Sequence, residues 1–280
     1  MSWEDNVRKV VPYTPGEQPK VKNIIAALPD PETVDLEALK AALKDGSVEL
    51  VCVLGPTASG KTKYAVKLAR ELGNTEIISA DSRQVYRRMD IGTGKDLSEY
   101  GEVPYHLIDI ADPGTQYNVY RFREDFLKAF DDIRERGAVP ILCGGTGLYI
   151  SAVTGGYDFQ TKKPLSAVSE LPAEAPKTFF IGTLVSREVR NARIDARLDA
   201  RLKEGMTDEI KGLLDSGIPA ETLISYGLEY KFVTLYLTGQ LDYDSMREHL
   251  AIAIHQFAKR QMTWFRGMER SGVRIHWVEV

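Results

Sequence analysis

Residues 55–62, with the sequence GPTASGKT, fit the phosphate-binding pattern G-x-x-x-x-G-K-[ST]. The apolar run VELVCVLG comes directly before them, and the amphipathic stretch GKTKYAVKLARELG overlaps their end. The loop therefore joins a predicted strand to a predicted helix, which is the context that this motif requires. Backbone N–H groups and the helix N-terminus form an anion site in such a loop. The sequence thus predicts a bound phosphate group, but the loop alone does not say which reaction uses it.

Two side chains of this loop have predicted roles of their own. Lys61 adds a positive charge, and the hydroxyl of Thr62 is placed to bind Mg²⁺. The residues predicted to hold the phosphate groups are Gly55, Pro56, Thr57, Ala58, Ser59, Gly60, Lys61 and Thr62.

A second polar segment follows the next predicted strand, with the sequence ISADSRQVYRRMDIGTGK. Asp81 lies where that strand ends, so it shares the ligand-binding edge of a parallel sheet with the phosphate loop. A carboxylate there can hold Mg²⁺ through water or act as a general base, and the simpler alternative is a loop cap. The arginines that follow, from Arg83 on, are interpreted as substrate or nucleic-acid contacts, with a solvated charged turn as the alternative.

A third stretch, CGGTGLYI, repeats the arrangement of strand, glycine turn and helix start. Gly144 and Gly145 permit a close approach of the backbone, and Thr146 offers a hydroxyl group. A tight turn without a ligand is the alternative interpretation.

Five stretches taken together resemble the tRNA dimethylallyltransferases, and they occur in the family's order: GPTASGKT, ISADSRQVYRRMDIGTGK, PYHLIDI, GGTGLYI and AKRQMTWFRGMER. The resemblance covers about residues 51–155 and 179–277. It implies an enzyme that transfers a dimethylallyl group from dimethylallyl diphosphate to the exocyclic amine of the adenosine next to the anticodon of tRNA. Diphosphate is released, Mg²⁺ is the implied cofactor, and the acceptor base must leave the anticodon stack.

The resemblance also assigns roles to single residues. Asp81 matches the carboxylate that holds the acceptor amine and can take its proton, and Thr57 matches the loop threonine near the bridging oxygen. With Lys61 these are the predicted catalytic residues. The residues that the family pattern places against the tRNA acceptor are Asp81, Ser82, Arg83, Gln84 and Thr146.

Strands that alternate with helices predict an α/β fold, with a P-loop NTPase-like core, a parallel sheet flanked by helices, and a helical C-terminal part. Residues 1–46 are proline-rich and polar at first, and then predict a short helix that begins after Asp35 and stops at Gly46. The predicted division of the chain is an N-terminal extension over 1–46, the first part of the core over 47–155, a linker over 156–178, and the rest of the core with the C-terminal helices over 179–280.

The chain departs from the family at two places. Members usually carry a helical insertion after GGTGLY that ends in an arginine-rich, tRNA-contacting helix, and here only the linker over 156–178 stands there. Many members have an arginine before a Gly-Tyr pair, where this chain has the stretch ISYGLEYKFV. An adenylate isopentenyltransferase acting on free AMP, ADP or ATP therefore remains an alternative. A small-molecule or nucleoside kinase, and a shortened or designed chain with weak or no activity, remain open as well.

Composition limits these choices. The net charge of −4 argues against indiscriminate coating of nucleic acid, although it allows a local basic surface. The stretch HQFAKRQMTWFRGMER, with Trp264 and Phe265 among its basic residues, is interpreted either as such a tRNA-binding surface or as a solvated helix face. Cys52 and Cys143 are expected to be buried thiols. The absence of long apolar runs predicts a cytoplasmic protein without a membrane anchor. We also expect a monomer.

Overall fold

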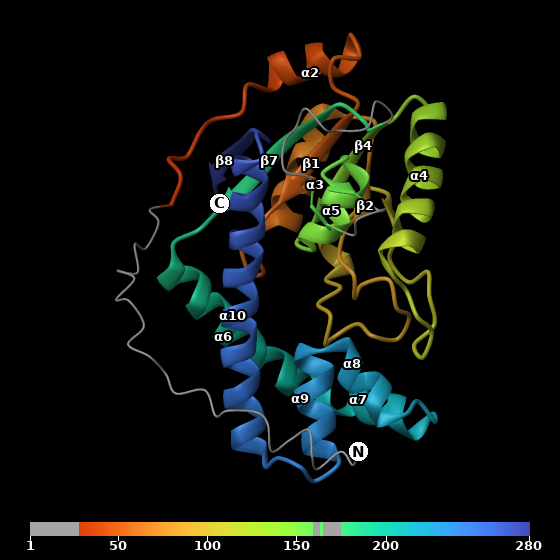
Figure 1. The fold of residues 1–280 in the computed structure, drawn as a ribbon, viewed down its shortest axis with the longest axis vertical. Helices are drawn as coiled ribbons and strands as arrows, with labels where there is room; N and C mark the ends of the chain where they lie inside the picture. The colour runs from red at the N-terminus through yellow and green to blue at the C-terminus, as the bar shows by residue number, and fades with distance from the viewer. Residues whose placement is uncertain (1–27, 159–162, 165–174) are drawn as a thin grey trace, which may run out of the picture.

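The computed structural model describes residues 28–158, 163–164 and 175–280 (Figure 1). Its centre is one sheet of six parallel strands in the order β3-β2-β4-β1-β7-β8. A short antiparallel pair lies apart from it. The strands are β1 (Leu50–Leu54), β2 (Thr75–Ser79), β3 (Tyr105–His106), β4 (Val139–Gly144), β5 (Tyr157–Asp158), β6 (Lys163–Pro164), β7 (Thr178–Leu184) and β8 (Ile275–Glu279).

Helices cover both faces of the sheet, and more helices extend beyond its edge (Figure 1). This confirms the predicted α/β class with a phosphate-loop core and a helical C-terminal part. The helices are α2 (Leu36–Lys44), α3 (Lys61–Leu72), the 3₁₀-helix η1 (Leu97–Glu99), α4 (Val119–Glu135), α5 (Gly147–Val153), α6 (Arg187–Glu204), α7 (Met206–Asp215), α8 (Ala220–Tyr226), α9 (Leu228–Leu237) and α10 (Tyr243–Arg270).

The central strand β1 is buried on both faces, as its continuous apolar run predicts. Successive side chains of a strand point to opposite faces. Val51 and Val53 join the apolar cluster under α2 and α3, while Leu50, Cys52 and Leu54 join the cluster that contains α4, α5 and α10. The sheet therefore separates two cores.

Local sequence explains where the main helices begin. The carboxylate of Asp35 accepts hydrogen bonds from the N–H groups of Glu37 and Ala38, and this confirms the predicted start of α2. Asn118 and Asp242 cap α4 and α10 in the same way. The described part of the predicted extension packs on the core, because Leu39 of α2 is buried. Residues 1–27 lie outside the described residues, and the boundary at residue 46 remains a prediction.

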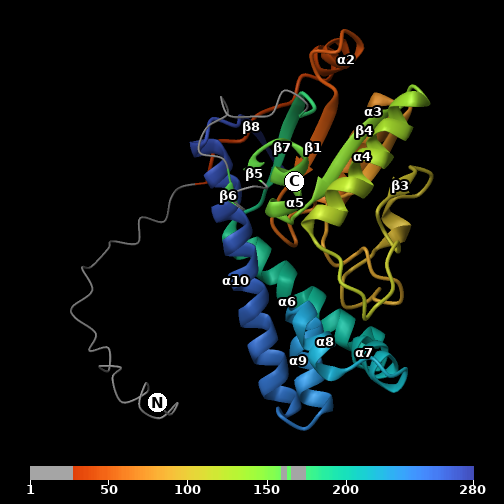
Figure 2. The same cartoon turned by 45° about the vertical axis from the view of Figure 1, so that its right-hand side comes forward.

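The helices α6 to α9 and the first half of α10 form a layer beside the sheet domain, which we call the helical lobe (Figure 2). The α6 helix leaves the carboxyl end of β7 and runs into this lobe. The continuous helical pattern over residues 186–217 breaks into α6 and α7 at Gly205, whose φ is 114°. That left-handed conformation favours glycine and ends the first helix.

Two sequence expectations need adjustment. The predicted strand VPYHLIDI is reduced to β3, because Leu107 and Asp109 have positive φ values that end the extended backbone. Within the predicted linker over 156–178, residues 159–162 and 165–174 lie outside the described residues, and β5 and β6 pair around the first gap. In the described ranges, every helix is too short or too polar to span a bilayer.

Candidate active site

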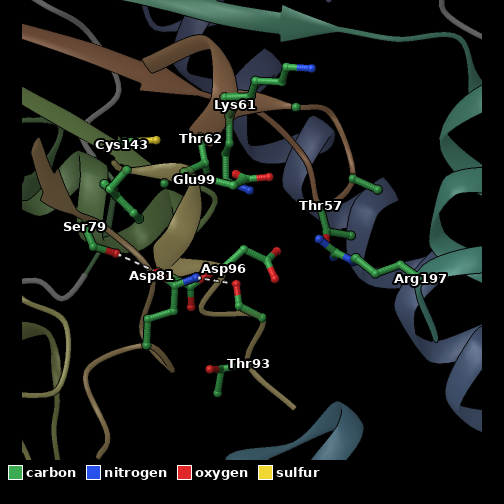
Figure 3. A pocket seen from close by; sticks show the side chains of 17 residues that line it. Thr57, Lys61, Thr62, Ser79, Asp81, Thr93, Asp96, Glu99, Cys143 and Arg197 are labelled. Carbon is green, nitrogen blue, oxygen red and sulfur yellow. Dashed lines mark hydrogen bonds between the residues drawn. The ribbon is translucent and has the colours of Figure 1, made fainter. Parts of the chain in front are cut away.

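A pocket of about 180 Å³ lies at the carboxyl edge of the sheet, between the phosphate loop, the ends of β2 and β4, and helix α6 (Figure 3). Parallel sheets bind ligands at this edge because the loops after neighbouring strands converge there. The sequence-predicted residues that line the pocket are Thr57, Ala58, Gly60, Lys61, Thr62, Asp81 and Gln84.

The remaining residues of the phosphate loop fix its conformation from the side that faces away from the pocket. Gly55 has no room for a side chain, because a Cβ atom would lie 2.1 Å from Oγ1 of Thr183. The hydroxyl of Ser59 is fully buried and lies 2.6 Å from that same Oγ1. Pro56 is buried too, and Gly60 takes a left-handed conformation with φ of 80°. Gly55, Pro56 and Ser59 therefore fix the curve of the loop and do not line the pocket.

A buried amide on α10 holds the loop in place. The side-chain oxygen of Gln261 accepts a hydrogen bond of 2.8 Å from the N–H of Thr57, and its amide nitrogen donates one of 2.9 Å to the carbonyl of Gly145. The residue thus connects the ends of β1 and β4. Sequence reasoning did not single out Gln261. The available signal was a lone amide among the apolar residues on the buried stripe of α10.

Arginine 197 is the second residue that sequence reasoning missed. It comes from α6, lines the pocket, and donates a 2.6 Å hydrogen bond from Nη2 to Oγ1 of Thr57 (Figure 3). Burial, and then the charge of Arg201, lower the pKa of Arg197 to about 10, so it stays a cation at neutral pH. The signal was its place on the buried face of α6, among Arg190, Ile194 and Leu198.

The pocket brings positive and negative groups together (Figure 3). Burial lowers the pKa of Lys61, while the nearby Asp81 acts in the opposite direction and favours the charged amine. Burial raises the pKa of Glu99, and the charge of Asp96 adds to that increase. The charge of Asp81 attracts both cations of the pocket, Lys61 and Arg197. Such an arrangement suits an anion beside a proton-accepting group.

The Asp81 carboxylate is oriented by the turn that follows it. Its Oδ1 accepts a 3.0 Å hydrogen bond from the N–H of Arg83, and that is its sole hydrogen bond within the described part of the chain. The N–H of Ser82 donates to Oγ1 of Thr146 at 3.2 Å, so the ends of β2 and β4 are connected. Gly144 permits this approach, because a Cβ atom there would lie 2.4 Å from the carbonyl oxygen of Ala80.

The predicted acceptor residues do not all face the pocket. Ser82 and Thr146 bond to each other beside it. Arg83 turns toward the junction of α8 and α9, where its Nη2 lies 3.0 Å from the position of a Cβ atom on Gly227. Gln84 lines the pocket, but its amide accepts from the Ser79 hydroxyl and donates to the carbonyl of Gly94, each at 3.2 Å. Asp81 and Gln84 are therefore the two predicted acceptor residues that line the pocket.

The basic stretch near the C-terminus lies on α10, with Lys259 and Arg260 exposed. Its two aromatic residues pack against the protein interior, with Trp264 half-buried. The indole N–H of Trp264 donates to the hydroxyl of Ser151 at 3.1 Å, and Phe265 is fully buried. Phe265 is therefore not free to stack on a base, and the tRNA-binding interpretation of this stretch stays a prediction. Both cysteines are buried, as expected, and burial raises the pKa of Cys143 to about 12.

The pocket offers oxygen ligands of the kind that Mg²⁺ prefers. Thr62, Asp81, Asp96 and Glu99 all line it. No group of three or more histidine, cysteine or acidic residues within the described chain is arranged to hold a metal ion by itself. Mg²⁺ is usually bound through one or two carboxylates together with substrate phosphates and water. These residues fit a metal ion shared with a phosphate ligand, and they do not form a closed protein cage.

Comparison with known sequences identifies the family of this chain. The family model described as IPP transferase matches residues 84–174 and 159–268, and a model described as isopentenyl transferase matches residues 48–102. The tRNA dimethylallyltransferase 1 of Porphyromonas gingivalis is 50% identical over 283 residues, which cover 82% of this chain and 93% of the relative. The chain belongs to the IPP transferase family.

Solved structures of the IPP transferase family agree with this assignment. A tRNA delta(2)-isopentenylpyrophosphate transferase from Staphylococcus epidermidis matches 82% of this chain and 92% of its own, with a TM-score of 0.72 and 30% identity. A full-length tRNA isopentenylpyrophosphate transferase from Bacillus halodurans matches 82% of this chain and 89% of its own, with a TM-score of 0.72 and 32% identity.

This member of the IPP transferase family is shorter than its relatives within the matched region. A relative from Parabacteroides distasonis, also a tRNA dimethylallyltransferase 1, is 46% identical over 286 residues, which cover 93% of it but 83% of this chain. Since 83% of 280 residues is about 232, about 54 of the 286 aligned positions hold a residue of the relative and none of this chain. These figures do not locate the difference, so the missing insertion after GGTGLY remains a prediction.

Proposed function

We propose that this chain transfers a dimethylallyl group from dimethylallyl diphosphate to the exocyclic amine of the adenosine next to the anticodon in tRNA. One observation supports this most strongly. A phosphate loop with two cations, Lys61 and Arg197, shares a pocket with the carboxylate of Asp81, in a chain 46–50% identical to proteins named tRNA dimethylallyltransferase. The reaction needs a site for a leaving diphosphate and a proton acceptor within one pocket.

The phosphate-loop side would stabilise the leaving group. Negative charge develops on the diphosphate as the bond between the allylic carbon and oxygen breaks. Donors that are already fixed in place lower that barrier, because they need not reorganise. Here the backbone of residues 55–62, Lys61 and Arg197 supply those donors, and Gln261 holds Thr57 in position. Mg²⁺ held by Thr62 and the diphosphate would supply further charge neutralisation.

The Asp81 side would hold the acceptor. The adenine amine attacks the allylic carbon, so one C–N bond forms as one C–O bond breaks. The amine then loses a proton, and the Asp81 carboxylate accepts it, since the carboxylate faces the pocket and has one oxygen engaged by the Arg83 N–H. The base reaches this pocket only after it leaves the anticodon stack. We propose that the protein acts as a monomer in the cytoplasm, on tRNA as its acceptor.

A second candidate rests on the shorter matched region. An adenylate isopentenyltransferase acts on free AMP, ADP or ATP. It needs less surface to bind this acceptor than an enzyme that binds the anticodon arm of tRNA. The roughly 54 positions that the relative has and this chain lacks favour this candidate. The long match to the IPP transferase model and the identity to named tRNA enzymes favour tRNA.

The test is a two-acceptor assay. Purified protein is incubated with labelled dimethylallyl diphosphate and Mg²⁺, together with either unmodified tRNA or AMP. We expect label in tRNA, at the adenosine beside the anticodon, and none in AMP. Label in AMP alone would replace the tRNA proposal by the second candidate. Pyrophosphate binding without transfer to either acceptor would identify a folded but inactive chain.

A further inference from the structure

The segment over residues 89–96, which we call the acceptor-side loop, forms the wall of the pocket opposite the phosphate loop. Thr93, Gly94 and Asp96 of this loop line the pocket. The loop contains no regular strand or helix, so its backbone N–H groups need other partners. The N–H groups of Gly94 and Lys95 bond to carbonyls within the loop, and three others find their partner in the helical lobe.

A single carboxylate on α7 satisfies three successive N–H groups of this loop. Glu209 accepts hydrogen bonds from the N–H of Asp90 at 2.8 Å, of Ile91 at 2.7 Å and of Gly92 at 3.1 Å. Successive N–H groups that converge in this way form an anion-binding concavity. Here a side chain of the protein fills that concavity, 117 residues away from Gly92 in sequence.

The carboxylate is held in turn by a tyrosine on α9. The hydroxyl of Tyr230 is fully buried and donates to Oε1 of Glu209 at 2.7 Å. The same ring fits against Gly92, where a Cβ atom would lie 2.8 Å from the tyrosine oxygen. Hydrogen bonds between a charged group and several donors are stronger than neutral ones, so this contact is expected to be rigid.

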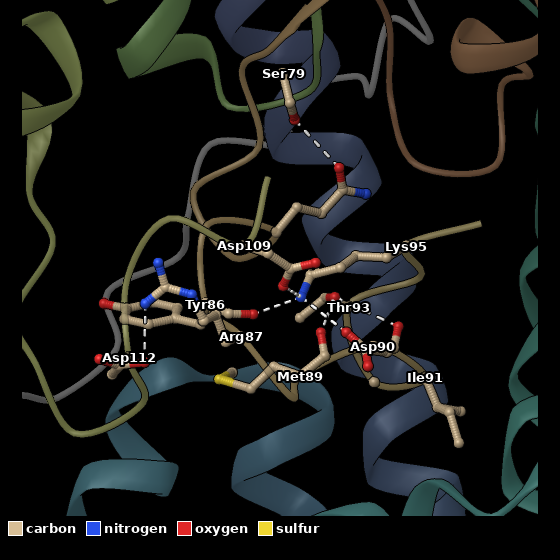
Figure 4. Close-up of polar contacts among 12 residues, drawn as sticks. Ser79, Tyr86, Arg87, Met89, Asp90, Ile91, Thr93, Lys95, Asp109 and Asp112 are labelled. Carbon is tan, nitrogen blue, oxygen red and sulfur yellow. Dashed lines mark hydrogen bonds and ion pairs between the residues drawn. The ribbon is translucent and has the colours of Figure 1, made fainter. Parts of the chain in front are cut away.

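The pocket side of the loop is fixed by separate contacts. The buried amine of Lys95 bonds to the carbonyl of Tyr86 and to the carboxylates of Asp90 and Asp109 (Figure 4). Arg201 of α6 lies directly against Gly94, so its guanidinium leaves no room for a side chain there. Gly94 also has the left-handed conformation that favours glycine. The loop is therefore held from the sheet by Lys95 and from the helical lobe by Glu209 and Arg201.

We propose that Glu209 is a positioning residue for the acceptor: through the N–H groups of Asp90, Ile91 and Gly92 it sets where the acceptor-side loop stands in the pocket. The inference rests on the proposed function, because it assigns that wall to the adenosine acceptor. Glu209 itself does not line the pocket. The donor side has its own supports, namely Gln261 and Arg197 on Thr57, so loss of Glu209 should spare the binding of dimethylallyl diphosphate.

The first experiment compares Glu209→Gln with Asp208→Asn, a matched control that removes one exposed negative charge from the same helix. An amide can accept through one oxygen, but its NH₂ group would oppose a backbone donor. A displacement of about 1 Å can cost about 10²-fold in rate. We expect kcat/KM for the tRNA acceptor to fall by about 10²-fold in Glu209→Gln, with KM for dimethylallyl diphosphate unchanged and the control like wild type.

The second measurement does not depend on activity. Hydrogen exchange at the amides of Asp90, Ile91 and Gly92 should be slow in the wild type and fast in Glu209→Gln. Tyr230→Phe, which removes one donor and keeps the ring, should show the same changes to a smaller degree. It serves as the test if Glu209→Gln does not fold.

Three outcomes would overturn the inference. The amides could remain protected in the variants, kcat/KM for the acceptor could stay at the wild-type value, or KM for both substrates could rise together, as general destabilisation predicts. Failure of the proposed function is distinguishable from all of these, because then the wild-type protein itself transfers nothing to tRNA, while the exchange measurement still reports the Glu209 contact.

Discussion

The two sides of the pocket are built in different ways. The phosphate-binding side consists of residues 55–62, a continuous turn between β1 and α3. The acceptor side consists of a loop without regular structure, which is held by Gln84, by Glu209 and by the contacts of its own Lys95. A local motif can bind an anion because the strand, turn and helix orient its N–H groups. An irregular wall depends on partners that are distant in sequence.

The helical lobe supports both sides of the pocket. One of its side chains lines the pocket directly, and another acts only through the loop that forms the pocket wall. Arg197 of α6 reaches the pocket itself and bonds to Thr57, 140 residues away in sequence. Glu209 of α7 contacts the acceptor-side loop without lining the pocket. We therefore expect variants of the donor side to change diphosphate binding and leaving-group chemistry, and variants of the acceptor side to change acceptor use.

The largest effect is expected at Asp81. In Asp81→Ala the acceptor amine loses its orienting and proton-accepting group, which typically costs about 10²–10⁴-fold in rate. Pyrophosphate binding should persist, because the phosphate loop is untouched. Single-turnover transfer and calorimetric titration of pyrophosphate measure the two properties separately. Near wild-type turnover would remove Asp81 from the mechanism.

Arg197 tests whether the helical lobe takes part in the chemistry. Loss of one fixed donor to a developing negative charge typically costs about 10²–10³-fold in kcat. We expect a loss of this size in Arg197→Ala. Arg193→Ala, at an exposed position of the same helix, provides the matched control. Equal activity of the two variants would show that the bond from Arg197 to Thr57 is structural only.

Lys61 tests the donor side by affinity and by pH. Lys61→Ala should weaken pyrophosphate binding by about 1.5–3 kcal/mol, the usual contribution of a charged hydrogen bond. Burial lowers the pKa of Lys61 below its ordinary value, and the negative charge of a bound diphosphate would favour the charged amine. Wild-type affinity should therefore hold at neutral pH and decline as the pH rises through the lowered pKa. Pyrophosphate affinity, titrated over a pH series, should no longer show this part of the decline in Lys61→Ala. A pH profile identical to that of the wild type would contradict the role of Lys61 in binding the diphosphate.

The smallest effects concern folding stability at two glycines. Gly144→Ala would place a Cβ atom 2.4 Å from the carbonyl oxygen of Ala80, between β4 and β2. Overpacking of this kind costs about 1–3 kcal/mol of unfolding free energy. Gly212→Ala on α7 meets nothing within 4 Å and should add about 0.4–1 kcal/mol. Urea denaturation measures the unfolding free energy of both variants. A destabilised Gly212→Ala would show that open space around a glycine does not by itself decide whether the substitution stabilises the fold.

Much of the fold follows from local patterns. Continuous apolar runs marked β1 and β4, and Asp35 marked the start of α2, because burial on both faces and helix capping leave direct signs in the sequence. The misjudged elements are those that tertiary contacts or special backbone conformations decide. The strand at β3 stops early at Leu107. The indole N–H of Trp264 bonds to the Ser151 hydroxyl, a contact between distant residues that no local pattern reveals.

The sequence by itself determined the phosphate loop, the position of Asp81 at the end of β2, and the family. Each of these depends on residues that are neighbours in the chain, or on the order of motifs along it. The tertiary structure alone decided that Arg197 and Gln261 meet at Thr57 and that Glu209 holds the acceptor-side loop. The physical reason is distance along the chain. A hydrogen bond requires its partners within about 3 Å, and partners separated by more than a hundred residues meet only after the sheet and the helical lobe have packed together.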